Sequence, residues 1–126
     1  MRSHRLPWTE IEGSDFSQAN LGQTDFRVST ISNTLFNGTN LSQSNFTSVE
    51  MDAVDFSDTN LEEADFTDAD LKDVNFKGAQ LGRANLETIP NLSCEQINSA
   101  KIDKHTKIPP HLEVIWEGKK FECKLR

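Results

Sequence analysis

The residue types that carry chemistry are few and scattered in this sequence. The three histidines are His4, His105 and His111, and Asp103 precedes His105 by two positions. Two neighbouring ligands do not make a metal site, and the six glycines form no phosphate-binding loop. The sequence therefore predicts no catalytic residue, no metal site and no cofactor, and we expect a protein that is not an enzyme.

The two cysteines, Cys94 and Cys123, both lie in the last third of the chain. In an oxidising compartment such a pair can form a disulfide. If Cys94 lies near a helix N-terminus, it can instead be a modestly acidic, reactive thiol. The third interpretation is two reduced, packed cysteines. The sequence leaves all three open.

The charge is acidic and uneven along the chain. The net charge is −7, but residues 9–88 hold 15 acidic and four basic residues, whereas each end carries a net charge of +2. The central segment should repel nucleic acid and anionic lipid, so we expect no direct nucleic-acid binding and no membrane association. With no apolar signal-peptide core, a cytoplasmic protein is expected. Export to a periplasm or thylakoid lumen is the alternative for a trimmed mature chain.

The sequence contains a five-residue repeat, and this repeat must position the charged and polar side chains named above. Large apolar residues recur at every fifth position from Ile11 to Leu86, and the residue two positions earlier is always small or β-branched. Period five fits neither a helix nor a simple strand, but it fits a chain that turns a corner every five residues. The predicted core residues are Ile11, Phe16, Leu21, Phe26, Ile31, Phe36, Leu41, Phe46, Met51, Phe56, Leu61, Phe66, Leu71, Phe76, Leu81 and Leu86.

Two longer periods predict the number of faces. Phenylalanine recurs every ten residues from Phe16 to Phe76, so the number of faces is even. Amide residues recur every twenty, which favours four faces, twenty residues per coil and an amide ladder between coils. The residues with this spacing are Asn20, Asn40, Asn60 and Gln80.

The pentads ADFTD at 64–68, ADLKD at 69–73 and ANL at 84–86 resemble the A(D/N)LXX signature of the pentapeptide-repeat family. The resemblance covers residues 9–88, sixteen pentads, although the first pentads have Thr or Ser in place of Ala. It implies an all-β solenoid, namely a right-handed four-sided β-helix of about four coils.

Solenoids need caps at both ends. We expect residues 1–8, with Pro7 and Trp8, to form an N-terminal lid, with a ligand-binding Trp8 as the alternative. Residues 89–126 should form a C-terminal cap. Ser93 and Gln96 have capping-box spacing, so a short helix is expected near 93–101. Residues 111–126 are ambiguous, although 117–120 are suited to a hairpin turn.

The expected function is a non-catalytic interaction or scaffold module that binds an unknown, possibly basic protein through a rigid acidic surface. Some relatives protect DNA gyrase by presenting a DNA-like rod of negative charge, so a gyrase-binding DNA mimic is the alternative that the resemblance implies. The sequence leaves monomer and dimer open. One predicted face is most acidic, and one outward leucine is a separate candidate contact. These residues are Glu10, Glu12, Glu50, Asp52, Asp70, Asp73 and Leu35.

Overall fold

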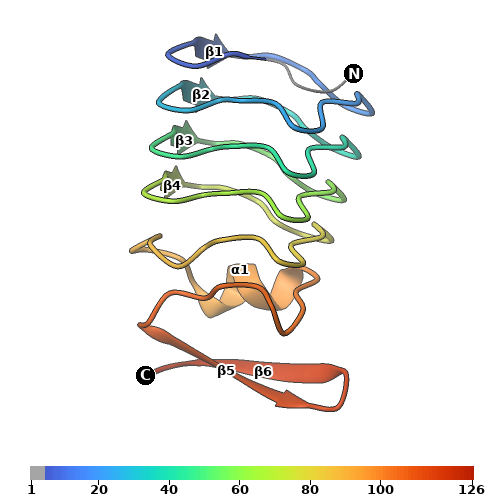
Figure 1. Ribbon diagram of the computed structural model, residues 1–126, viewed down its shortest axis with the longest axis vertical. Coiled ribbons are helices and arrows are strands. Elements are labelled where there is room, and N and C mark those ends of the chain that lie inside the picture. Colours follow the sequence, from blue (N-terminus) through green and yellow to red (C-terminus); the bar gives the residue numbers. More distant parts are fainter. Residues whose placement is uncertain (1–4) are drawn as a thin grey trace.

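Four three-residue strands, one from each coil, stack in parallel along one face of a solenoid (Figure 1). The structure, a computed structural model, describes residues 5–126. Each strand pairs with the residues twenty positions later, so Ile11, Ile31, Met51 and Leu71 lie in one column. The expected right-handed four-sided β-helix with twenty residues per coil is therefore confirmed. The strands are β1 (Glu10–Glu12), β2 (Thr30–Ser32), β3 (Glu50–Asp52) and β4 (Asp70–Lys72).

The interior consists of two phenylalanine columns on opposite faces. In one column the Phe36 ring stacks on Phe16 and on Phe56 with centroids 5.3 Å apart. In the other, Phe26 stacks on Phe46 at 4.9 Å. Rings of the two columns meet edge to face, an arrangement that favours aromatic contact beyond area burial. All sixteen predicted core residues are buried except Phe16 and Leu21, which are half-buried because they belong to the first coil.

The turns at the corners of each coil explain why an Asp or Asn often precedes the central residue of a pentad. On three faces this side chain accepts a hydrogen bond from the backbone N–H two residues later, as Asp15 does from Ser17 and Asp65 does from Thr67. Such local bonds favour tight turns. Left-handed backbone then recurs every five residues, from Trp8 to Arg83. The fourth face lacks this bond and forms the regular strands β1–β4.

The N-terminal lid expected over residues 1–8 stays a prediction, but residues 5–8 continue the repeat. Residues 5–8 form one more pentad, in which the Leu6 N–H donates to the Asp25 carbonyl at 2.6 Å and the Trp8 N–H donates to the Arg27 carbonyl at 3.0 Å. Trp8 is 79% exposed, whereas Leu6 is half-buried against the core. The lid was expected because the register was counted from Ile11, whereas Leu6 occupies the same position one pentad earlier. Residues 1–4 of the expected lid lie outside the described residues.

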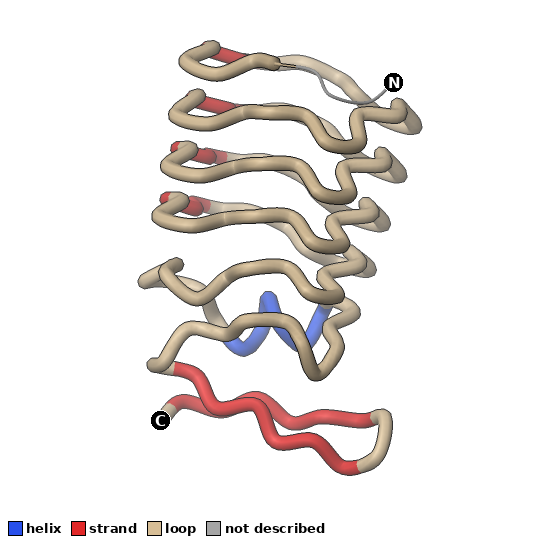
Figure 2. The backbone as a smooth tube through the Cα atoms, in the orientation of Figure 1, coloured by secondary structure: helices blue, strands red, loops and turns tan. Residues whose placement is uncertain are grey.

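After Leu86 the chain forms a fifth coil that contains the expected helix, α1 (Cys94–Ser99) (Figure 2). Ser93 is the N-cap, and both hydrogen bonds of its capping box with Gln96 are present. Ile89 and Ile97 are buried beneath the fourth coil. The helix therefore closes the apolar interior at this end.

A hairpin of β5 (Leu112–Glu117) and β6 (Lys120–Leu125) lies below the fifth coil (Figure 1). Gly118, with φ +64°, provides the left-handed residue of its two-residue turn. Alternation along the strands places six of its apolar residues on one face, whereas Ile115 lies on the other and is exposed. The six residues are Leu112, Val114, Trp116, Phe121, Cys123 and Leu125.

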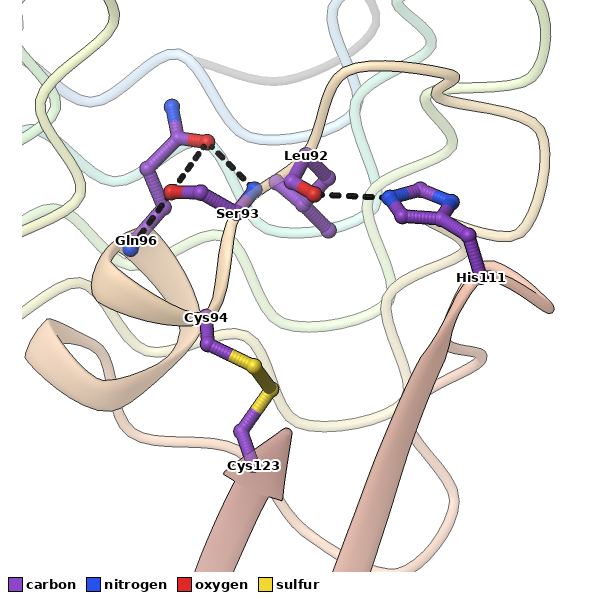
Figure 3. Close-up of a disulfide and its surroundings, with 6 residues drawn as sticks. All are labelled: Leu92, Ser93, Cys94, Gln96, His111 and Cys123. Carbon is purple, nitrogen blue, oxygen red and sulfur yellow. Dashed lines mark hydrogen bonds between the residues drawn. A yellow bond between two sulfur atoms is a disulfide. The ribbon is translucent and has the colours of Figure 1, made fainter. Parts of the chain in front are cut away.

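A disulfide joins the helix to the hairpin (Figure 3). Cys94 at the start of α1 and Cys123 in β6 have Cα atoms 5.4 Å apart. Beside it, the His111 Nε2 lies 2.8 Å from the Leu92 carbonyl oxygen. Of the three interpretations of the cysteines, the structure contains the disulfide, which fixes the hairpin against the end of the solenoid.

Candidate interaction surface

The outward surface of β1–β4, here called the strand face together with the corner residue Asp73 that follows β4, carries the six acidic residues proposed from the sequence. Because side chains alternate along a strand, the residue on each side of the buried central residue points outward. Glu50 and Asp70 are neighbours in one outward column, and Asp52 and Lys72 are neighbours in the other. All six acidic residues are exposed. They are Glu10, Glu12, Glu50, Asp52, Asp70 and Asp73.

The acidic residues form two groups rather than one continuous stripe. Glu10 and Glu12 on β1 are separated from the acids of β3 and β4 by the neutral residues Thr30 and Ser32 of β2. Within residues 5–126 the ion pairs are Arg27–Asp25 at 2.8 Å and Arg83–Glu63 at 3.7 Å. No carboxylate of the strand face belongs to either pair, although Lys72 lies next to Asp52 in register.

A shallow hollow of about 340 Å³ lies on this face, lined by residues of β2, β3 and β4. Ile31 and Met51 contribute to its floor, and Glu50 and Asp52 stand on either side. Carboxylates beside an open hollow can accept hydrogen bonds from Lys or Arg side chains of another molecule. Three carboxylates and one lysine, Lys72, line the hollow, so the arrangement favours the docking of cationic groups.

The apolar candidate, Leu35, does not join the strand face. It is 42% exposed and lies between Asp15 and Asp55 on the face of Phe36. Trp8, for which ligand binding was the alternative to a lid, is an exposed aromatic at the corner before the strand face. Val28, 39% exposed, occupies the same corner one coil below. Counting the five-residue register back by one pentad would have placed Trp8 at this corner.

The predicted amide ladder is present between one pair of coils only. Asn40 donates to the Asn20 side-chain oxygen at 3.2 Å. Lower in this column, the Asn60 oxygen accepts from the Glu62 N–H, as the corners require. A longer ladder runs three residues further along each coil, where Gln23 donates to Gln43 at 2.8 Å and Gln43 donates to Glu63 at 3.0 Å.

The carboxyl groups with shifted pKa values lie away from the strand face. A hydrogen bond from Arg27 lowers the pKa of Asp25, and hydrogen bonds from Ser17 lower that of Asp15. Burial alone would raise the pKa of Asp55 and of Asp103, but hydrogen bonds from neighbouring groups outweigh it and lower both. These aspartates act as turn acceptors, so their pKa shifts have a structural cause.

Residues 5–126 contain neither a metal-site cluster nor a helix suited to a membrane. No cluster of three or more His, Cys, Asp or Glu side chains is arranged to hold a metal ion in this part of the chain. The longest helix described there has six residues, and none is long and apolar enough to cross a bilayer.

The sequence of residues 9–86 matches the family described as "Pentapeptide repeat region". This match covers more than half of the chain, so the protein belongs to the pentapeptide-repeat family, and the family resemblance is confirmed. A comparison with curated proteins found no match.

Two solved structures share the fold. One is a pentapeptide repeat protein from the thylakoid lumen of Arabidopsis thaliana, with 30% identity and a TM-score of 0.64 over 70% of this chain and 59% of that one. The chain thus spans less than two thirds of that protein. The other is Rfr23 from the cyanobacterium Cyanothece 51142, with 18% identity and a TM-score of 0.59 over 82% of this chain and 87% of that one.

Proposed function

We propose that this protein is a non-catalytic interaction module that docks a basic partner protein on its strand face. The observation that carries the proposal is the set of six exposed carboxylates on and beside one parallel sheet, none of them ion-paired within residues 5–126. Glu50 and Asp70 are adjacent in register, and like charges in this position are destabilising. A basic partner would relieve that repulsion.

The solenoid suits this role because its surface is held rigidly. Consecutive coils bond through backbone groups on all four faces, and the core beneath the strand face is buried. A rigid, complementary charged surface accelerates encounter and limits the choice of partners. Little conformational entropy would be lost by the face itself on binding.

Affinity capture from the source cells tests the proposal with three forms of the protein. In the face variant, Glu50, Asp52, Asp70 and Asp73 are each replaced by Lys. The control variant places the same four charge changes on the remaining surface. We expect a basic protein to be retained by the wild type and the control variant and lost from the face variant. Equal recovery by all three forms would reject the strand face. The control positions are Asp58, Glu62, Asp68 and Glu87, all exposed.

The alternative, a gyrase-binding DNA mimic, has a separate test. The acids of the strand face span only four coils, which is short for a DNA-like rod of negative charge. A supercoiling assay with purified gyrase distinguishes the two functions. The docking proposal expects neither inhibition nor protection of gyrase at micromolar protein.

The disulfide is evidence about the cellular compartment in which the protein resides. Disulfides persist in oxidising compartments and are rare in the cytosol, and the Arabidopsis protein comes from the thylakoid lumen. The Cys94–Cys123 bond therefore favours an oxidising compartment over the cytoplasm. Thiol titration of protein whose free thiols were blocked at lysis should detect the bond. Two free thiols per chain would favour the cytoplasm.

A further inference from the structure

The corner that precedes β1 and β2, in the first two coils of the solenoid (Figure 1), carries two exposed apolar side chains. Trp8 is 79% exposed and Val28 is 39% exposed. In the third and fourth coils the same corner position is occupied by the polar residues Ser48 and Asp68. Trp8 and Val28, here called the apolar corner, therefore border only the part of the strand face that β1 and β2 form.

The backbone at the apolar corner is unfavourable for these residue types. The φ angle is +62° at Trp8 and +63° at Val28, a region in which bulky and β-branched residues are outliers. The conformation is held from both sides of the indole. The Trp8 N–H donates to the Arg27 carbonyl at 3.0 Å, and the Thr9 N–H donates to the Ser29 hydroxyl oxygen at 3.1 Å. Residues held in strained backbone cluster at functional sites, which points to a contact for this exposed aromatic.

Negative charge lies beside the apolar corner. Thr9 alone separates Trp8 from Glu10, and both flanking residues are exposed. Their Cα atoms are therefore within about 7 Å of each other. The partner of Glu10 in register on β2 is the neutral Thr30. A side chain that covers the indole can thus also reach a carboxylate whose charge is not offset by its neighbour in register.

The arginines on the face before this corner lie beside another carboxylate. The Arg27 Nη2 is 2.8 Å from an oxygen of Asp25, and the Arg27 Nε donates to the same carboxylate at 2.9 Å. Arg5 is adjacent to Asp25 in register. Because Asp25 binds the Arg27 guanidinium, the Trp8 indole is left for a cation from another molecule.

We propose that the apolar corner anchors an arginine side chain of the basic partner, with its guanidinium stacked on the Trp8 indole and hydrogen-bonded to the Glu10 carboxylate. This inference rests on the proposed function, because the corner borders the strand face. Indole is the best of the aromatic rings for binding cations, and arginine takes this position more often than lysine. A planar guanidinium can stack on a ring while it donates to a carboxylate, whereas an ammonium is a compact, strongly hydrated charge. Val28 packs against the methylene groups of the same side chain.

NMR titration of the full chain with two peptides tests the proposal. Each peptide is an acetylated and amidated heptapeptide of glycine with lysine at its second and sixth positions. The fourth position holds arginine in one peptide and lysine in the other. We expect the arginine peptide to bind about two- to fivefold more tightly and to shift the indole N–H resonance of Trp8. The variant Trp116→Phe identifies that resonance by removing the signal of the second tryptophan.

Three variants test the residues of the anchor. Trp8→Asn removes the ring and introduces a residue that tolerates left-handed backbone, so the fold should be retained and the preference for the arginine peptide lost. Glu10→Gln keeps the size of the side chain and should reduce the preference. Leu35→Ala, the control, removes an exposed apolar side chain on another face and should leave the preference unchanged.

Equal affinity of the wild type for both peptides would overturn the proposal. A Trp8 resonance that shifts with protein concentration in the absence of peptide would also overturn it, because a second copy would then cover the corner. Shifts confined to β3 and β4 would overturn the anchor while supporting docking on the strand face. Equal capture of a basic protein by the wild type and the face variant would instead reject the strand face, while a preference for arginine at Trp8 would stand.

Discussion

At the scale of the residue, each position of the pentad has a separate physical task. The central residue fills the interior, the small residue before it lets the chain pass close to the core, and the Asp or Asn between them accepts a backbone hydrogen bond at the corner. The residue two positions after the central one turns the corner and has left-handed backbone. Thirteen described non-glycine residues take this conformation, which costs L-amino acids about 1–2 kcal/mol each.

Val28 is the least suited of these corner residues. Its φ is +63°, and β-branched side chains are genuine outliers there. We expect Val28→Asn to raise the free energy of unfolding by about 1 kcal/mol, because asparagine tolerates left-handed backbone. Urea unfolding measures the change. Val28→Thr keeps the branch and should show no gain, whereas an equal gain from both variants would rule out relief of backbone strain.

Asp55 makes stability depend on pH in the acid range. Its pKa is lowered from 3.8 because hydrogen bonds from Ser57 and Asn37 outweigh the effect of burial. Stability from this group is therefore complete above the unfolded value and is lost as the pH falls through the lowered folded pKa. Unfolding of the wild type and Asp55→Asn, compared from neutral pH to about pH 3, should show a difference that shrinks with falling pH. A constant difference would contradict this assignment.

At the scale of the element, the C-terminal cap replaces backbone partners with side chains. The Asn91 amide donates to the Leu71 carbonyl and the Gln96 amide donates to the Val74 carbonyl. The spacing of Ser93 and Gln96 predicted the helix, because a capping box is local. The sequence could not predict the contact of Gln96 with Val74, since that contact depends on how the helix lies beneath the fourth coil.

The disulfide should contribute much of the stability of the cap. It closes a loop with a sequence separation of 29, and the chain-entropy estimate for such a loop is about 3–4 kcal/mol. We expect reductant to increase hydrogen exchange first in β5 and β6, since the hairpin bonds to the coils through few backbone groups. The double variant Cys94→Ser, Cys123→Ser should exchange equally with and without reductant. A uniform loss of hydrogen-exchange protection across all coils would contradict a disulfide that stabilises the cap alone.

Like charges on the strand face should lower the stability of the folded protein. Asp70 is adjacent in register to Glu50, and such pairs of like charge destabilise by about 0.2–1 kcal/mol. We expect Asp70→Asn to stabilise the protein by an amount in that range at low salt, with the gain reduced at high salt by screening. Asp68→Asn, at a corner beside the neutral residues Ser48 and Thr88, is the matched control. A destabilising Asp70→Asn would contradict the assumed repulsion.

At the scale of the whole molecule, the five-residue period predicted the architecture because it is repeated without a slip from Ile11 to Leu86. The ten-residue spacing of phenylalanine and the twenty-residue spacing of amides predicted the four faces and both phenylalanine columns. The repeat did not predict how α1 and the hairpin follow the fourth coil. There the structure depends on packing between segments that the period does not describe.

The same regularity makes the surface a set of fixed columns, so charge on one face acts as a unit. The central claim is that a basic partner recognises the strand face rather than the overall negative charge. The dissociation constant of the captured partner, measured for the wild type, the face variant and the control variant, tests this claim most directly. The account predicts binding weaker by about a hundredfold or more for the face variant and little change for the control. Equal weakening of both variants would contradict it, because net charge alone would then explain the binding.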